Sequence, residues 1–403
     1  MNKSTFFSGQ PVFAQLIGLI PSHLVTSLSA KHEADRYYKR FKCWDHVVTL
    51  LYSSFHNCTS LREVITGMEA SYNKLIHLKL THLPRRSTLS DANTHRTEAF
   101  FEALYHRLYQ HFYGRLPDSR GGRSLEERLF VLDSTTVSFF SDVMKGAGTY
   151  GANGRKKGGA KAHVLLRALV DLPHLIYITE ASRNDRIAMD RVALSRGDIL
   201  VFDKGYNHYA KWQSWTEEGI NWVTRLSDTA AYHVVQERPV STEEQKKGVC
   251  SDQKIFLGAG TGARQITVRL VSFYVDRHKK IYHFLTNNFR FKASSIAGLY
   301  ERRWAIEVFF KRFKQSSPLK AFLGESENSI KIQLWCAFIK DLLLKVLKES
   351  LKRSWSFSNL SAMVRHHLMN YIDVVKFLNN PDKVKEAMYK SPPPSPQLLL
   401  FAT

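Results

Sequence analysis

The chain has 403 residues, and its 58 Lys and Arg against 36 Asp and Glu leave a formal charge of +22 at pH 7. This length is enough for two or three domains with ordinary cores, so neither disulfides nor a metal are needed to hold the fold. The charge favours a polyanionic partner, first of all nucleic acid, because neutralising phosphates releases condensed counterions.

Two classes of protein are not expected from the sequence. The four cysteines lie far apart, which argues against a disulfide scaffold and a structural zinc site and favours a reducing cytosol. No stretch approaches 18 apolar residues without a charge, and the N-terminus lacks a small-residue cleavage site, so neither secretion nor membrane insertion is expected. A basic protein without a polyanionic partner stays an alternative, because the cations are spread along the whole chain.

The first part of the chain is predicted to be helical. From about residue 10 to 115 apolar residues recur at helical spacing, as in WDHVVTLLYSSFHN and TEAFFEALYHRLYQHFYG. This predicts an all-helical N-terminal domain over residues 1–115. A turn-rich, charged link over residues 116–128 ends it.

Strand-like runs follow the link. They are RLFVLDSTTVSFF, AHVLLRALVD and HLIYITEA, then a helix-like AMDRVALS and the strand-like ILVFDKGY. Between the first two lies MKGAGTYGANGRKKGGAK, which we interpret as a solvated hairpin loop. A phosphate-binding loop is the alternative, but the G-x-x-x-x-G-K-[ST] spacing is missing.

A helix (YAKWQSWTEEG) and a strand (INWVTRL) come next, and then about 60 residues alternate in β fashion. They predict a β-rich insertion over about residues 226–290. Helical spacing returns at Ser294 and continues through a C-terminal region over residues 346–403. Its SPPPSPQ segment predicts a disordered tail.

Two aspartates end apolar runs. Asp133 follows LFVL and Asp203 follows ILVF, so both are expected at the C-terminal edge of buried strands, where α/β sheets bind ligands. Two carboxylates there repel each other unless a cation lies between them, and Glu307, from a helix, would complete a divalent site. Oxygen ligands suit magnesium or manganese, and two such ions about 4 Å apart can drive phosphodiester cleavage. Either aspartate alone could instead simply begin a turn.

The segment YERRWAIEVFFKRFK, residues 300–314, is predicted to form one continuous helix. Its face carrying Glu307 spans an arc of about 80° and also holds cations and one tyrosine. The neighbouring apolar face is expected to pack on the sheet. Arg303 and Lys314 are candidates to hold phosphates and Tyr300 to contact a sugar or base, although Arg303 and Glu307 could instead form a plain surface ion pair. The first face consists of Tyr300, Arg303, Glu307, Lys311 and Lys314, and the apolar face of Ile306, Phe309, Phe310 and Phe313.

These residues resemble the DDE transposases of bacterial insertion sequences, in particular the group with the signature Y-x2-R-x3-E-x6-K. Tyr300, Arg303, Glu307 and Lys314 match this signature without a gap. FVLDSTT and VFDKGY resemble the two aspartate motifs, and TNN and FLGESENSIKIQLW resemble segments around the last helix. FKCWDHVVTLLY, SLREV and RRSTLSDAN are similar to the helical domain that precedes the catalytic core in one branch of the group.

The resemblance implies an α/β fold: a ribonuclease-H-like catalytic core over about residues 125–345, with the β-rich insertion between its second and third acids. Asp133, Asp203 and Glu307 are then the catalytic residues and hold two Mg²⁺ ions, for which Mn²⁺ can substitute. Tyr300, Arg303, Lys311 and Lys314 contact DNA, and residues 1–115 form a DNA-binding domain.

The implied activity is cutting DNA at transposon ends and joining the 3′ hydroxyl to target DNA. The partners are double-stranded DNA and a second copy of the chain, with no membrane involved. The place is the bacterial cytoplasm, at the nucleoid when DNA is bound. A nuclease that cuts without joining and a catalytically silent DNA-binding remnant are the alternatives.

Some polar residues receive no role. His163 is expected to be a buried strand histidine. Asn184 and Asp185 could help to seat a metal or a DNA strand, but a turn explains them equally well. No motif selects among the tryptophans, for which packing is the default.

Overall fold

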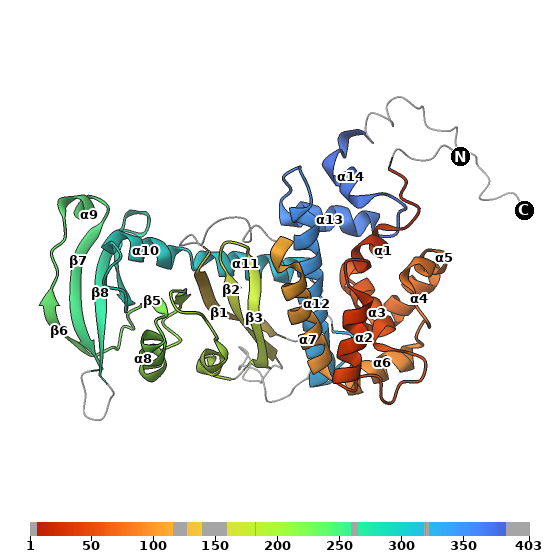
Figure 1. The fold of residues 1–403 in the computed structure, drawn as a ribbon, viewed down its shortest axis with the longest axis horizontal. Helices are drawn as coiled ribbons and strands as arrows, with labels where there is room; N and C mark the ends of the chain where they lie inside the picture. The colour runs from red at the N-terminus through yellow and green to blue at the C-terminus, as the bar shows by residue number, and fades with distance from the viewer. Residues whose placement is uncertain are drawn as a thin grey trace, which may run out of the picture.

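The computed structural model describes residues 6–115, 127–138, 159–181, 183–258, 265–317, 319 and 322–383. A mixed nine-stranded sheet occupies one end of the molecule and a helical body the other (Figure 1). The proline-rich tail, most of the charged link and most of the Gly- and Lys-rich loop lie outside the described residues. No helix in the described ranges has the length and apolar character required to cross a membrane.

Five strands form the centre of the fold, in the order β3-β2-β1-β4-β5. β2 runs antiparallel to β1 and β3, whereas β4 runs parallel to both β1 and β5. This is the arrangement of a ribonuclease-H-like core, so the predicted α/β class is confirmed. The strands are β1 (Leu129–Ser138), β2 (Gly159–Arg167), β3 (Leu172–Glu180), β4 (Ile199–Phe202) and β5 (Asn221–Arg225).

The helix expected at AMDRVALS starts earlier, ends earlier and has the 3₁₀ form. This 3₁₀-helix is η4 (Asp185–Arg191). The Asn184 side chain caps its start by accepting from the Arg186 N–H, and Val192 already has extended backbone at its end. Only seven residues are left between these two points, which favours the short, tight helix type.

The insertion continues the same sheet. Helix α8 (Tyr209–Glu217) comes before β5, and β9 of the insertion pairs antiparallel with β5, which gives the full order β3-β2-β1-β4-β5-β9-β8-β7-β6. The elements are β6 (Tyr232–Glu237), α9 (Thr242–Lys246), β7 (Val249–Leu257), β8 (Ile266–Val275), the 3₁₀-helix η5 (Asp276–His278) and β9 (Lys280–Thr286).

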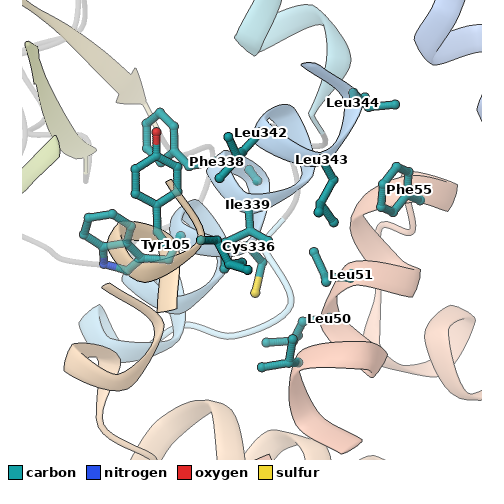
Figure 2. Close-up of a cluster of buried hydrophobic side chains, with 14 of the residues drawn as sticks. Leu50, Leu51, Phe55, Tyr105, Cys336, Phe338, Ile339, Leu342, Leu343 and Leu344 are labelled. Carbon is teal, nitrogen blue, oxygen red and sulfur yellow. The ribbon is translucent and has the colours of Figure 1, made fainter. Parts of the chain in front are cut away.

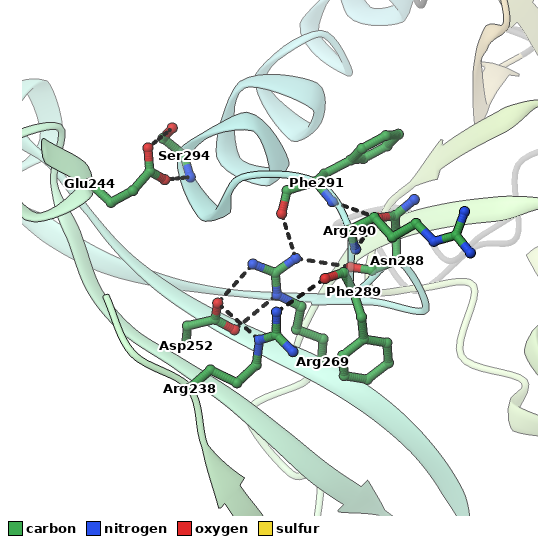
Figure 3. Close-up of polar contacts among 9 residues, drawn as sticks. All are labelled: Arg238, Glu244, Asp252, Arg269, Asn288, Phe289, Arg290, Phe291 and Ser294. Carbon is green, nitrogen blue, oxygen red and sulfur yellow. Dashed lines mark hydrogen bonds and ion pairs between the residues drawn. The ribbon is translucent and has the colours of Figure 1, made fainter. Parts of the chain in front are cut away.

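A buried ionic cluster ties the insertion to the helix that follows it (Figure 3). Asp252 on β7 accepts two hydrogen bonds from Arg269, at 2.9 and 2.7 Å, and one from Arg238 at 3.3 Å. Arg269 also donates to the carbonyls of Asn288 and Phe291, at 3.0 and 2.8 Å, just before α10 (Ala293–Glu301). Because bidentate Arg–carboxylate pairs are geometrically specific, the cluster fixes where α10 begins.

The helical body is built from both ends of the chain. Apolar side chains of the N-terminal helices and of α12 near the C-terminus share one core; Figure 2 shows Leu50, Leu51 and Phe55 facing α12. The contributors are α1 (Val12–Ile17), α2 (Ser22–Lys31), α3 (Cys43–His56), α4 (Leu61–Ala70), α5 (Tyr72–Leu75), η1 (Ile76–Leu78), α6 (Arg86–His95), α7 (Glu98–Phe112), η2 (Tyr113–Arg115), α12 (Glu327–Glu349), α13 (Phe357–His367) and α14 (Val374–Asn379).

Polar contacts fasten α12 inside this body. Asn328 donates to the carbonyls of Asn93 and Arg96, at 3.0 and 2.8 Å, and the Trp335 indole donates to Glu98 at 3.0 Å. The N-terminal 115 residues alone therefore do not complete the core of the helical body. It needs α12, the helix that comes after residues 300–314 in the sequence.

Lys340 on α12 makes the stability of the fold depend on pH. Its ammonium group is buried and donates to the carbonyls of Ser54 on α3 and Ser316 at the end of α11 (Trp304–Ser316), at 2.7 and 2.6 Å. Burial lowers the pKa of Lys340 to about 7. Between this value and the ordinary lysine pKa of about 10.4, the unfolded chain binds more protons than the folded chain. The free energy of unfolding should therefore rise with pH through this window, by up to about 1.4 kcal/mol per pH unit.

The test is a set of urea unfolding curves between about pH 7 and about pH 10 for the natural chain and for Lys340→Met. The difference in unfolding free energy between the two proteins should grow with pH. A constant difference would show that Lys340 keeps its ordinary pKa in the folded state.

Candidate active site

The two predicted aspartates lie at the same edge of the sheet. In the parallel pair of β1 and β4, Leu132 lies opposite Phe202, and each aspartate is the next residue along its strand direction. Asp133 still belongs to β1, whereas Asp203 is the first residue after β4. One Asp133 carboxyl oxygen accepts the Ser134 N–H at 2.8 Å.

The single helix expected over residues 300–314 is wrong. α10 ends at Glu301, the chain turns through Arg302 and Arg303, and α11 begins at Trp304. The turn is tightened by i→i+3 bonds, one of them from the Arg303 N–H to the Tyr300 carbonyl at 3.0 Å. The reason is that the two helices bury their apolar faces in different clusters, α10 against the insertion side of the sheet and α11 in the core shared with the helical body. Arg302 and Arg303 both keep right-handed helical backbone angles, so the interruption is local.

The apolar face of α11 packs as expected: Ile306, Phe309, Phe310 and Phe313 are all buried. With this face fixed, Glu307 is directed toward Asp133, and Arg303 lies between the two. Arg303 donates to Asp133 Oδ2 at 3.3 Å through Nη1 and to Glu307 Oε1 through Nη2. The ion pair considered as an alternative for Arg303 and Glu307 thus exists, and it extends to Asp133.

Tyr300 reaches the remaining acid. Its hydroxyl donates to Asp203 Oδ1 at 3.2 Å from the end of α10. The three carboxylates, from β1, the end of β4 and α11, are thus held on the same side of the sheet by two donors: Arg303 for Asp133 and Glu307, and Tyr300 for Asp203. Tyr300 and Glu307 belong to different helices, yet both side chains point to the same edge of the sheet.

Burial and charge act together at this edge. Burial raises the pKa of Asp133 to about 6, and the neighbouring carboxylates of Asp203 and Glu307 add to this rise while the Ser134 N–H and Arg303 oppose it. Burial and the Asp203 carboxylate likewise raise the pKa of Tyr300 to about 12. Three acids and one guanidinium leave two negative charges in excess (3 − 1 = 2). A divalent cation would neutralise that excess, so the donor set fits a divalent metal.

The three acids do not form a complete metal-binding site in this structure. Among the described residues, no three His, Cys, Asp or Glu side chains stand close enough to hold an ion. The position of Arg303 explains this, because its guanidinium separates the carboxylates of Asp133 and Glu307.

The other two predicted residues lie further along α11. Lys314 Nζ donates to the Thr136 carbonyl of β1 at 2.9 Å, and Lys311 is exposed. Trp304 and Val308, 63% and 50% exposed, stand on the solvent side of the same helix. The solvent face of α11 next to Glu307 therefore combines positive charge with apolar surface.

Asp185, which received no role from the sequence, lies beside this site. It begins η4, and its Oδ1 accepts from the Ser134 hydroxyl at 2.9 Å and lies 3.2 Å from Lys161 Nζ. His163 is buried as expected and bonded to the Thr179 hydroxyl at 3.0 Å, and burial lowers its pKa to about 4. No sequence pattern distinguishes Asp185 from an aspartate that simply begins a turn.

Comparison with known proteins agrees with this geometry. Residues 124–339 match the family model of the transposase DDE domain. The chain belongs to this transposase family. Members of the family generally use divalent metal ions, and this transposase acts on DNA. Residues 8–79 match a second family model, described as a domain of unknown function.

Individual relatives of the transposase extend over much of its length. A protein of Sinorhizobium fredii that carries the name of a transposase is 29% identical over 320 residues, which are 79% of this chain and 86% of the relative. One of Geobacillus stearothermophilus, named as a transposase for an insertion sequence element, is 28% identical over 231 residues, 57% of this chain and 59% of the relative. Among solved structures, a piggyBac transposase synaptic complex with hairpin DNA matches at 10% identity and a TM-score of 0.41, covering 96% of this chain and 85% of that one.

Proposed function

We propose that this transposase cuts DNA at the ends of an insertion sequence and joins the freed 3′ hydroxyl to target DNA, with Asp133, Asp203 and Glu307 as its catalytic acids. The observation that carries the proposal is that Asp133 and Asp203 follow paired residues of neighbouring parallel strands, while Arg303 bonds both Asp133 and Glu307 and Tyr300 bonds Asp203. The surplus of two negative charges supports a metal-dependent phosphoryl transfer rather than catalysis by a lone general base.

The proposed cofactor is a pair of Mg²⁺ ions held by Asp133, Asp203 and Glu307, with Mn²⁺ as a substitute. When bound, such ions supply a Lewis acid that activates a water or hydroxyl and neutralises the leaving oxygen. The protein's own part is positioning. Tyr300 orients Asp203 through its hydroxyl, and without the ions Arg303 pairs with both Asp133 and Glu307.

The DNA contacts proposed for this site come from α10 and α11. Arg303 and Lys314 hold phosphates on either side of the scissile bond, exposed Lys311 adds a third positive charge, and Tyr300 contacts a sugar or base. The working form is a homodimer on double-stranded DNA, because two transposon ends have to be brought together. It acts in the bacterial cytoplasm, at the nucleoid.

The proposal also divides the chain by role. Residues 1–115 bind DNA, residues 125–345 carry catalysis with the insertion at about 226–290, and residues 346–403 are the C-terminal region, helical where the structure describes it. The strands of the insertion and the helices before residue 115 support this division. The packing of α12 against α3 and α7 joins the first two parts through a shared core.

A strand-transfer assay tests the function. Purified transposase, Mg²⁺, a plasmid and a labelled duplex carrying the DNA that borders the gene should give plasmid covalently joined to the label. Short inverted repeats in that bordering DNA are expected as well. Oligonucleotides that are only shortened would identify a nuclease, and binding without any Mg²⁺-dependent nicking would identify a silent remnant; either result contradicts the proposal.

A further inference from the structure

Two loops of the helical body form a strongly basic surface, which we call the basic loop pair: residues 36–42 and residues 79–86. Together they contain seven Lys and Arg and no Asp or Glu. The first loop joins α2 to α3 and the second leads from η1 into α6. α6 lies on the opposite side of α12 from the sheet, so this surface is separate from the carboxylate site (Figure 1).

A buried carboxylate holds the two loops side by side. Asp45 on α3 is fully buried and accepts the backbone N–H of Lys42 from one loop, at 3.2 Å, and that of Thr81 from the other, at 2.9 Å. The Thr81 hydroxyl donates to it too. The Trp44 indole donates to the Leu78 carbonyl at 2.9 Å, where the second loop begins. Because a buried carboxylate needs hydrogen-bond donors and Asp45 receives them from both loops, the fold fixes the distance between the two loops.

A buried arginine is bonded to the backbone of the first loop. Arg96 is 1% exposed and donates to the carbonyls of Ala34 and Phe41, at 3.0 and 2.7 Å. It also pairs with Asp35 at 3.3 Å and lies over the Tyr38 ring. Asp35 is thereby paired with a buried arginine, and two carbonyls at the two sides of the loop are bonded to the same guanidinium.

All seven cations of the basic loop pair are exposed. Arg36 pairs with Glu33, but in the part of the chain that the structure describes the other six form no ion pair. All six are exposed, and Tyr37 between them is 83% exposed. The six charges repel one another, and a bound polyanion removes this repulsion. They are Lys39, Arg40, Lys42, Lys79, Arg85 and Arg86.

We propose that the basic loop pair binds the phosphate backbone of duplex DNA at a second site, away from the catalytic acids. This inference rests on the proposed function and deepens it, because it gives named DNA contacts to the part of the chain that matches a domain of unknown function. Fixed loops that each carry Lys or Arg suit the phosphates of a duplex. Tyr37 adds a hydroxyl able to reach a phosphate or sugar.

The experiment measures binding of the full chain to a labelled duplex of about 40 base pairs of the bordering DNA, in EDTA and over a range of salt concentrations. Two variants each remove a pair of charges, Lys39→Gln with Arg40→Gln and Arg85→Gln with Arg86→Gln. Each should weaken binding by roughly tenfold or more and lower the slope of log affinity against log salt by about 2, since each lost phosphate contact removes about 0.9. Arg85→Lys with Arg86→Lys keeps the charge and should bind like the natural chain.

The matched control is Lys246→Gln with Arg277→Gln, which removes two equally exposed charges from the insertion and should change neither quantity. Unchanged binding in either loop variant, or an equal loss in the control, would overturn the proposal. Circular dichroism confirms folding. This binding test needs no metal and no strand transfer. If the natural chain showed no strand transfer, the proposed function would be contradicted, but the binding test could still support or contradict the role of the basic loop pair.

Discussion

Replacing Asp133 or Asp203 by Asn, or Glu307 by Gln, should lower Mg²⁺-dependent strand cleavage by at least about a thousandfold. Each change removes one negative charge from the proposed set of three acids, in which Arg303 bonds Asp133 and Glu307 and Tyr300 bonds Asp203. A metal site loses several kcal/mol of charge stabilisation with a ligand, whereas an amide of the same shape keeps the packing. DNA binding should be unchanged, because the acids do not attract phosphates. The measurement is cleavage of labelled end duplex with excess enzyme, beside a binding assay.

Glu301→Gln is the matched control for this series. Glu301 is the last residue of α10, one residue after Tyr300, but its side chain is exposed. Cleavage by this variant should stay within about twofold of the natural chain. Near-normal cleavage by any one of the three triad variants would remove that acid from the proposed site.

Arg312→Met should lower the free energy of unfolding by about 3–5 kcal/mol, because removing one partner of a buried ion pair leaves an uncompensated charge. Arg312 lies on α11 and is largely buried. It pairs with Asp171 in the turn between β2 and β3 and, at 3.2 Å, with Asp341 on α12. Asp341 is 3% exposed, and burial already raises its pKa to about 6 with Arg312 in place.

Urea unfolding of the purified proteins measures this loss, with Lys311→Met on the exposed face of α11 as the control, expected within about 0.5 kcal/mol. Without Arg312 the folded state favours protonated Asp341 more strongly, so the loss should be smaller at about pH 5 than at about pH 8. Adding Asp341→Asn should restore part of the stability. A loss below about 1 kcal/mol would mean that water reaches the cluster and screens it.

Much of the sheet edge could be predicted because its signal is local. An apolar run that ends in an acid gives both a strand and the position of the acid on it, and the register of Leu132 with Phe202 follows from the parallel pairing. The helix break at Arg302 and Arg303 could not be predicted in this way. Residues 300–314 are all compatible with one helix, and only the separate cores that α10 and α11 enter force the turn.

Contacts between segments that lie far apart in the chain could not be predicted from the sequence. Asp185 reaches Ser134 across 51 positions, and nothing in ASRNDR distinguishes it from an ordinary turn acid. The role of Arg303 was predicted only in part. Its spacing to Glu307 is helical, but its contact with Asp133 depends on how α11 crosses β1.

The enclosure of α12 by helices from the other end of the chain has a consequence for biosynthesis. Helices α3 and α7 are translated more than 200 residues before α12, and until it leaves the ribosome the apolar surface that they bury against α12 is uncovered. We expect the nascent N-terminal third to depend on chaperones during this interval. A messenger truncated before α12 would then yield an aggregation-prone fragment that proteases remove, rather than a free DNA-binding module.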